Sequence, residues 1–194
     1  DYGVRLNYVT GAMANGIASE AVVIAMARAG MLGIFGAAGL SLPRIEAAID
    51  TIQAEAGDLR YGFNLIHSPS EPQHEQATVA LYLARGVRVI SAAAFLRLTP
   101  TVVQFRATGL HRDAEGAIIS PNRIIAKVSR EEVAEQFLRP APKAMLDKLV
   151  AAGKITSDEA KLAALIPVAD DLTAEADSGG HTDGQSAPVL IPLL

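Results

Sequence analysis

The stretch Asp177-Ser178-Gly179-Gly180-His181-Thr182-Asp183 carries the residue types best suited to chemistry in this chain. It holds one of only four histidines, with two glycines directly before it and an aspartate on each side. Imidazole changes its charge near neutral pH, and glycine leaves room for a ligand beside it. The same composition is also typical of a solvated acidic turn. The stretch is therefore either a functional loop around His181 or a surface turn.

The acidic residues around His181 allow another interpretation, a divalent metal site. Glu175, Asp177 and Asp183 would supply oxygen ligands and His181 a nitrogen ligand. Their spacing matches no metal-binding motif that we recognise. We therefore expect no metal site here.

Two other polar residues, Asn64 and Lys127, interrupt apolar runs that predict buried strands. An asparagine at a strand end often bonds to its own backbone, and a lysine can extend its ammonium to solvent. Both residues nevertheless stand near the C-terminal ends of their predicted strands, where parallel α/β folds bind ligands. This shared placement favours a ligand-binding role for both.

The residues that follow several predicted strands are small. Gly11-Ala12-Met13-Ala14 follows the first strand, Gly36-Ala37-Ala38-Gly39 the second, and alanines 92–94 end the fourth. A rim of glycine and alanine suits a broad, largely apolar ligand held by backbone amides and a few polar side chains.

An alternation of strands and helices must position these residues. Short apolar runs predict strands, and segments opened by Ser, Thr or Pro and closed by Gly predict helices. Strands are expected at 6–10, 31–35, 61–66, 87–93, 124–128 and 171–176. Helices are expected at 19–29, 41–56, 70–85, from 99, at 129–138, 144–152 and from 156. Capping boxes are predicted at 70–73 and 129–132, a helix cap at 156–159 and a hairpin turn at 111–116.

Repeated β-then-α units predict an α/β protein with a parallel sheet covered by helices. A doubly wound open sheet and a (β/α)8 TIM barrel both fit this pattern. We favour the barrel as one domain over residues 1–194. About six of its eight units are expected here, with a helical insertion at 140–167 after the fifth unit and the last two units beyond Leu194.

The composition narrows the class of protein further. The chain has 194 residues, half of them hydrophobic, and a net charge of −4 without a long basic run, which disfavours nucleic-acid binding. It has no cysteine, which excludes disulfides, thiolate metal sites and cysteine nucleophiles. No run is long enough to span a membrane. A cytoplasmic protein is therefore expected.

Five stretches together resemble the flavin-dependent nitronate monooxygenase (2-nitropropane dioxygenase-like) barrels. More closely, the chain resembles the trans-acting, FMN-dependent enoyl reductases of polyketide and polyunsaturated fatty acid synthases. The stretches are Thr10-Gly-Ala-Met-Ala-Asn-Gly16, Ala29-Gly-Met-Leu-Gly33, Tyr61-Gly-Phe-Asn-Leu65, Ala126-Lys-Val128 and Ser178-Gly-Gly-His-Thr182. Two longer matches, Phe63 to Pro69 and Glu175 to His181, are specific to the synthase branch.

The resemblance implies an FMN-binding barrel that uses NADPH as the hydride source. It implies flavin contacts from the backbone of Gly11, Ala12 and Met13 and from the side chains of Asn64 and Lys127. His181 matches the active-site histidine beside the ring, and its loop residues Asp177, Gly179 and Gly180 are expected to line the cofactor. The implied partners are an enoyl thioester on acyl carrier protein and other synthase modules, and a homodimer is compatible with the resemblance.

Two positions depart from the broader family, which often has glycine where Ala12 and Asp183 stand. The second departure bears on substrate contacts near His181. The family's phosphate-binding loops are expected beyond Leu194, so no phosphate ligand is assigned here.

The implied reaction is reduction of the enoyl double bond. Lys127 would stabilise the reduced, anionic flavin, and His181 would polarise the thioester carbonyl or supply a proton. Two rivals remain: a nitronate monooxygenase on the same barrel, with His181 as the base, and a non-catalytic scaffold fragment of a synthase.

Overall fold

The computed structural model describes residues 2–175 and residue 192. The chain divides into two compact units, residues 1–91 and 92–194. Among the described residues, six of the eight strands alternate with helices along the sequence, as an α/β protein requires, and this fold class is confirmed. The strands are β1 (Val9–Thr10), β2 (Leu32–Phe35), β3 (Tyr61–Ile66), β4 (Val89–Ala93), β7 (Arg123–Val128) and β8 (Asp171–Ala174).

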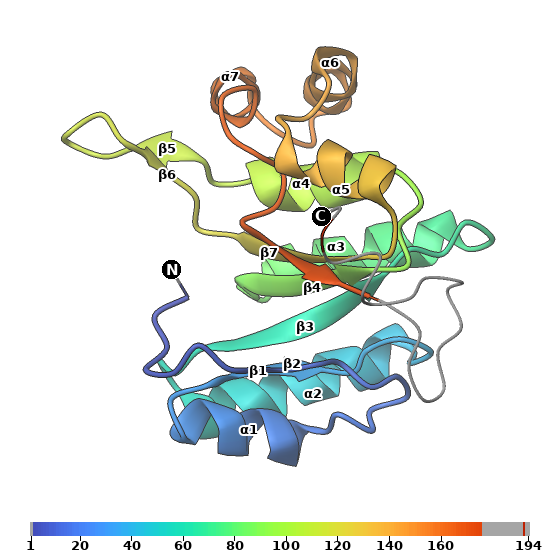
Figure 1. The fold of residues 1–194 in the computed structure, drawn as a ribbon, viewed down its shortest axis with the longest axis vertical. Helices are drawn as coiled ribbons and strands as arrows, with labels where there is room; N and C mark the ends of the chain where they lie inside the picture. The colour runs from blue at the N-terminus through green and yellow to red at the C-terminus, as the bar shows by residue number, and fades with distance from the viewer. Residues whose placement is uncertain (1, 176–191, 193–194) are drawn as a thin grey trace. The chain divides into compact units, whose positions relative to one another are not determined.

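The first unit is built on β1, β2 and β3, which pair in parallel in that order. Three helices follow these strands, and α1 and α2 lie along the same side of them (Figure 1). The helices are α1 (Glu20–Arg28), α2 (Leu42–Ala56) and α3 (Pro72–Ala84). Parallel neighbours joined by crossover helices are the β/α repeat that the sequence predicts.

Local sequence explains where the first two helices begin and end. The Ser19 side chain accepts a hydrogen bond from the Val22 amide at the start of α1, and Gly30 follows the helix at a φ of +74°. In α2 the isoleucines at 45, 49 and 52 are fully or almost fully buried. Their helical spacing places them on one face.

Aromatic rings join strands and helix in the core of the first unit. The ring centroids of Phe35 and Phe63 lie 5.2 Å apart, and those of Phe63 and Tyr82 lie 5.4 Å apart. All three side chains are fully buried. This cluster fixes α3 against β2 and β3, with tilted ring pairs that add to the burial of apolar area.

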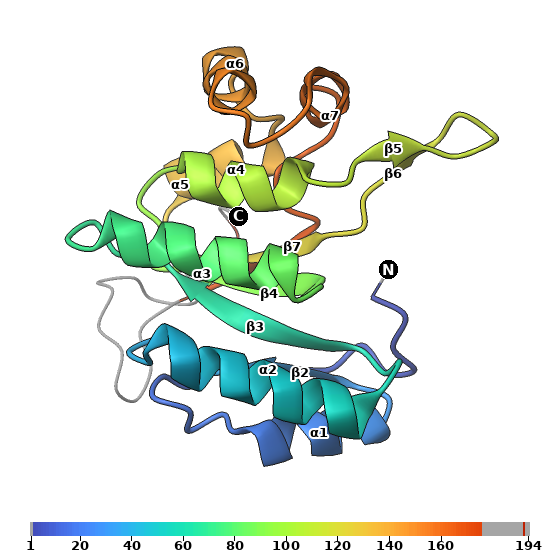
Figure 2. The ribbon, with the colours of Figure 1, turned by 180° about the vertical axis from the view of Figure 1, so that it is seen from behind.

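The second unit contains the parallel pair β7–β8, in which Lys127 lies opposite Thr173. Its helices are α4 (Pro100–Ala107), α5 (Glu131–Leu138), α6 (Lys143–Ala151) and α7 (Ser157–Ala163). Figure 2 shows α6 and α7 side by side above α4, which both contact. The predicted hairpin is β5 (His111–Arg112) with β6 (Ile118–Ile119), an antiparallel ribbon that projects beyond α4 (Figure 2).

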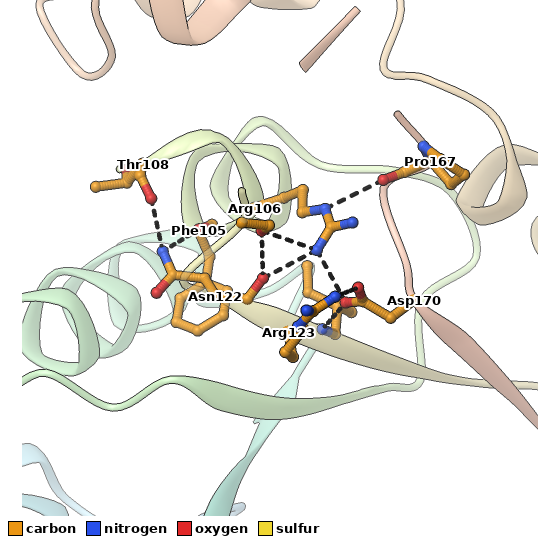
Figure 3. Close-up of polar contacts among 9 residues, drawn as sticks. Phe105, Arg106, Thr108, Asn122, Arg123, Pro167 and Asp170 are labelled. Carbon is orange, nitrogen blue, oxygen red and sulfur yellow. Dashed lines mark hydrogen bonds and ion pairs between the residues drawn. The ribbon is translucent and has the colours of Figure 1, made fainter. Parts of the chain in front are cut away.

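A buried polar network around Arg106 joins three segments of the second unit (Figure 3). Its guanidinium donates to Asp170 Oδ2 at 2.9 Å, to the carbonyls of Asn122 and Pro167, and to Ser120 Oγ. Asp170 also accepts from Arg123 and from the Ile124 amide. Arg106 thereby connects α4 to the residues that lead into β7 and β8.

Three details of the prediction are wrong. The first strand is two residues long, not five. α3 is capped at Glu71 rather than Ser70, because Pro72 occupies the first helical position and holds Glu71 out of the helix. α5 begins after Arg130 rather than Ser129, with Glu131 and Glu132 in its first turn. Neither helix has a side-chain cap, so both predicted capping boxes are absent. At Thr156, where a helix cap is predicted, Thr156 and Glu159 form a capping box.

We predict that Glu20 makes the stability of the fold pH-dependent. Arg44 Nη1 lies 2.5 Å from Glu20 Oε1, and this hydrogen bond lowers the pKa of the Glu20 carboxyl below its ordinary value of 4.5. The stabilisation is therefore complete above pH 4.5 and is lost as the pH falls through the lower, folded-state value. Because Arg44 is partly exposed, the stabilisation by the Glu20–Arg44 ion pair is about 0.2–1 kcal/mol.

Urea unfolding at neutral and acidic pH checks this prediction. Glu20→Gln should lower the free energy of unfolding at neutral pH and converge on the parent at the acidic end. The control is Glu55→Gln, which removes the more exposed ion pair with Arg28 and should change stability less. A constant Glu20→Gln difference across the pH range would contradict the assignment.

Candidate active site

The loop after β1 contains Gly11, Ala12 and Met13, and the loop after β2 holds it in place. The Asn15 amide donates to the Ala38 carbonyl at 2.8 Å, the Gly16 amide to the Gly36 carbonyl, and the Gly36 amide to the Ala18 carbonyl. Asn15 adopts a φ of +56°, which asparagine tolerates better than most residues. Backbone bonds in both directions therefore fix the course of this loop.

The two loops approach so closely that position 36 has no room for a side chain. A Cβ built on Gly36 would lie 1.6 Å from the Met13 carbonyl oxygen. A Cβ on Gly11, in contrast, would meet no atom within 4 Å. Met13 is 48% exposed. The loop thus presents a fixed backbone and open space on the side of Gly11, as a surface for a flat ligand would.

Asn64 lies in β3 and is 5% exposed. Its side-chain Nδ2 donates to the main-chain carbonyl of Ser91 at 3.1 Å, and the main-chain carbonyl of Asn64 accepts from the Tyr82 hydroxyl at 2.8 Å. Burial raises the pKa of Tyr82, so this hydroxyl remains a donor. The Asn64 side chain thus bonds to the main chain of Ser91, a distant residue, and not to its own backbone.

A cavity of about 220 Å³ lies beside Asn64, between the loop after β2 and the start of α3. Its polar lining includes Ser41, Ser68, His74, Glu75 and Thr78. The cavity opens where β2 and β3 end, at the edge where ligands bind in parallel α/β folds.

The sequence interpretation missed one buried pair beside this cavity. His67 Nδ1 lies 2.8 Å from Glu75 Oε2, with side chains only 11% and 3% exposed. A signal was present in the sequence, because Glu75 shares a helical face with Val79 and Tyr82. A carboxylate on an apolar helix face indicates a buried partner.

Lys127, in the second unit, forms an ion pair with Glu175. Its Nζ lies 2.5 Å from Glu175 Oε1, and the side chains are 31% and 13% exposed. The Glu175 amide donates to the Val128 carbonyl, which places the carboxylate just beyond the parallel β7–β8 pair. Lys127 is therefore held at the strand end by a carboxylate that the metal interpretation had assigned as a ligand.

Some of the predicted site residues lie in the first unit, one lies in the second, and the others lie outside the described residues. Gly11, Ala12, Met13 and Asn64 belong to the first unit and Lys127 to the second. Asp177, Gly179, Gly180 and His181 lie outside the described residues, so their roles remain predictions. Within residues 2–175, no group of three or more histidines and carboxylates is arranged to bind a metal. None of the helices described is long and apolar enough to cross a membrane.

Known proteins resemble the chain over its whole length. It is 51% identical over 193 residues to a component of the polyunsaturated fatty acid synthase of Thraustochytrium sp., and 48% identical over 195 residues to the polyketide biosynthesis protein PksE of Bacillus subtilis. Each match covers the entire chain but only 13% and 25% of these relatives. No protein-family model matches the chain.

Solved structures define the class of fold. The enoyl reductase domain of MlnA, from the macrolactin biosynthesis cluster of Bacillus amyloliquefaciens, matches with a TM-score of 0.93 and 37% identity. The match covers 98% of this chain and 43% of that domain. FabK of Thermotoga maritima shares the fold alone, with a TM-score of 0.59 and 18% identity over 98% of this chain and 47% of that one.

The chain is thus an α/β protein of the TIM-barrel class that carries part of the barrel. It is homologous to a segment of polyketide and polyunsaturated fatty acid synthase proteins, and the resemblance predicted from the sequence is confirmed.

Proposed function

We propose that the chain is part of a flavin enzyme that reduces the double bond of an enoyl thioester carried by acyl carrier protein. FMN would be the cofactor and NADPH the hydride source. The observation that carries the proposal is the match to the enoyl reductase domain of MlnA, at 37% identity over 98% of the chain. Kinship with synthase components and with PksE supports a thioester substrate within a synthase.

The residues described here fit a flat, polar-edged cofactor such as FMN. The loop at Gly11, Ala12 and Met13 offers a fixed backbone and open space. Within residues 2–175, the hydroxyl of Thr10 at the end of β1 is buried without a hydrogen-bond partner. A buried polar atom of this kind is unusual and is consistent with a ligand group that completes it.

Bound FMN would supply hydride transfer from NADPH to the β-carbon of the enoyl group. The backbone of Gly11, Ala12 and Met13 would contact the ring, and the Asn64 side chain would hydrogen-bond to the flavin. Lys127, whose ammonium Glu175 holds, would place positive charge near the ring. Asp177, Gly179 and Gly180 would line the cofactor, and His181 would polarise the thioester carbonyl or give a proton.

Further parts of the proposal concern the whole protein. Residues 1–194 would form part of an FMN-binding barrel, and 140–167, which contain α6 and α7, would be a helical insertion in it. The protein would act in the cytoplasm, with other synthase modules as partners and a homodimer as a compatible assembly.

The visible absorption spectrum of the full-length protein tests the proposal. We expect a flavin band that bleaches anaerobically on addition of NADPH and returns on addition of an enoyl thioester on carrier protein. A protein that stays colourless after addition of FMN would contradict the proposal and favour the scaffold alternative. A bound flavin that NADPH does not reduce, but that supports oxidation of a nitronate by oxygen, would favour the monooxygenase alternative.

A further inference from the structure

The loop between β4 and α4 is held at both ends by α5. Phe95 is 4% exposed, and its ring meets that of Phe137 edge to face at a centroid distance of 5.8 Å. Further along the loop, the Leu98 amide donates to Gln136 Oε1 at 3.2 Å, and the Leu98 side chain is buried. Phe137 and Gln136 both belong to α5, in the same unit as the loop. The second unit therefore positions this loop by itself.

Ala94, at the start of the loop, has a strained backbone. Its φ of +62° lies in the left-handed region, which residues with a Cβ seldom adopt. Such a conformation persists only where the surrounding structure imposes it, and it is most frequent at functional sites. The anchors at Phe95 and Leu98 supply that constraint here.

Between the two anchors the loop presents an apolar side chain to solvent. Leu96 is 65% exposed, although Phe95 before it and Leu98 after it are buried. Arg97 is exposed as well, and its guanidinium has no hydrogen-bond or ion-pair partner among the residues that the structure describes. A single exposed leucine is ordinary on a protein surface, so its place in the fold decides the interpretation.

That place is the end of the strands where ligands bind. The loop follows the C-terminal end of β4, and the loops at this end of the strands form the active sites of TIM barrels. Alanines 92–94, which lead into the loop, have no polar side-chain atom. A ligand beside Leu96 therefore meets apolar groups. In the substrate proposed above, the acyl chain is the apolar part.

We propose that Leu96 binds the acyl chain of the thioester and gives the protein a preference for long chains. The inference rests on the proposed function, which supplies the thioester. Each methylene group that Leu96 helps to remove from water adds to the binding free energy, so the contribution grows with chain length. A residue that contacts only the flavin or the thioester carbonyl would act on short and long chains alike.

Binding of saturated thioesters to the full-length protein tests this contact without turnover. The probes are butyryl and decanoyl groups on carrier protein, which are products of the proposed reaction, and the readout is the Kd of each. The parent should bind the decanoyl form more tightly. Leu96→Ser should weaken decanoyl binding about tenfold or more and butyryl binding about twofold or less. Leu96→Met, of similar volume, should restore the preference. The kcat/KM for the matching enoyl thioesters should change in the same way.

The matched control is Leu165→Ser. Leu165 is 61% exposed, but it leads from α7 toward β8 and does not follow the C-terminal end of a strand. This variant should keep the parent Kd for both thioesters, and Arg97→Gln should keep the preference for the decanoyl form. The unfolding midpoint and the Kd for FMN should be the same in Leu96→Ser as in the parent.

The outcomes separate this inference from the proposed function. Equal weakening of both thioesters by Leu96→Ser, or no weakening, would overturn the inference while the proposed function stands. A lower unfolding midpoint would show that Leu96 packs against another part of the full-length protein, and a weaker Kd for FMN would show that it contacts the cofactor. Either result would also overturn the inference. A parent that binds the thioesters with the expected preference but reduces no enoyl group would overturn the proposed function alone.

Discussion

Replacing Arg106 with methionine should lower the free energy of unfolding by about 3–5 kcal/mol, the range for breaking a buried ion pair from one side. The guanidinium is 5% exposed and donates to four acceptors in three segments of the second unit (Figure 3). Methionine has a similar length but no donor. The carbonyls of Asn122 and Pro167 would lose these hydrogen bonds.

The expected loss lies toward the lower end of that range, because Asp170 keeps other partners. Arg123 Nη1 lies 2.7 Å from its Oδ1, and the Ile124 amide donates to its Oδ2 at 2.8 Å. Chemical unfolding followed by circular dichroism measures the change. If Asp170 carries most of the coupling, Arg106→Met with Asp170→Asn should be less destabilised than the sum of the single changes.

The matched control is Arg139→Met on α5's C-terminal side. Arg139 forms an ion pair with Glu135, but the side chains are 70% and 55% exposed. Its loss should change stability by no more than about 0.5 kcal/mol. Equal effects of the two substitutions would contradict the view that the Arg106 network holds the second unit together.

Short apolar runs, helix-capping residues and the glycines and prolines between elements were sufficient to predict most elements of this fold. β3 matches its predicted range, because a short apolar run lies between Gly57 and the turn residues after Ile66. Ser19, Thr99 and Thr156 cap their helices as predicted, since each side chain has a free backbone amide within reach. The predictions at Ser70 and Ser129 are wrong by one residue, because the capping positions are Glu71 and Arg130, and neither makes a side-chain cap hydrogen bond.

Contacts between distant segments could not be predicted in the same way. Lys127 and Glu175 meet only because β7 and β8 pair in a particular register, and register depends on tertiary packing. His67 and Glu75 are close in sequence, but their contact depends on the path of the segment before α3. The sequence offered a hint for Glu75, a charge on an apolar helix face, yet it did not identify the partner.

Replacing Gly36 with alanine should displace the loop after β1 and abolish tight FMN binding. The new Cβ would lie 1.6 Å from the Met13 carbonyl oxygen and 2.6 Å from its carbonyl carbon. Both are backbone atoms, so no side-chain rotation relieves the clash. Overpacking of this kind costs about 1–3 kcal/mol or more. We expect a matching fall in the free energy of unfolding, together with at least a tenfold (about 1.4 kcal/mol) weaker Kd for FMN.

Gly11→Ala separates loop displacement from direct contact with the cofactor. A Cβ at Gly11 meets nothing within 4 Å, so the apo protein should unfold at the parent midpoint. If the flavin ring lies against this backbone, the methyl group should nevertheless weaken FMN binding. Weak binding by both variants, with loss of stability only in Gly36→Ala, would establish the loop as a preformed cofactor surface. If Gly11→Ala binds FMN as tightly as the parent, the proposed contact between the flavin ring and this backbone would be wrong, although the position of the loop itself would stand. Parent-like stability of Gly36→Ala would show that the close approach of the two loops is wrong.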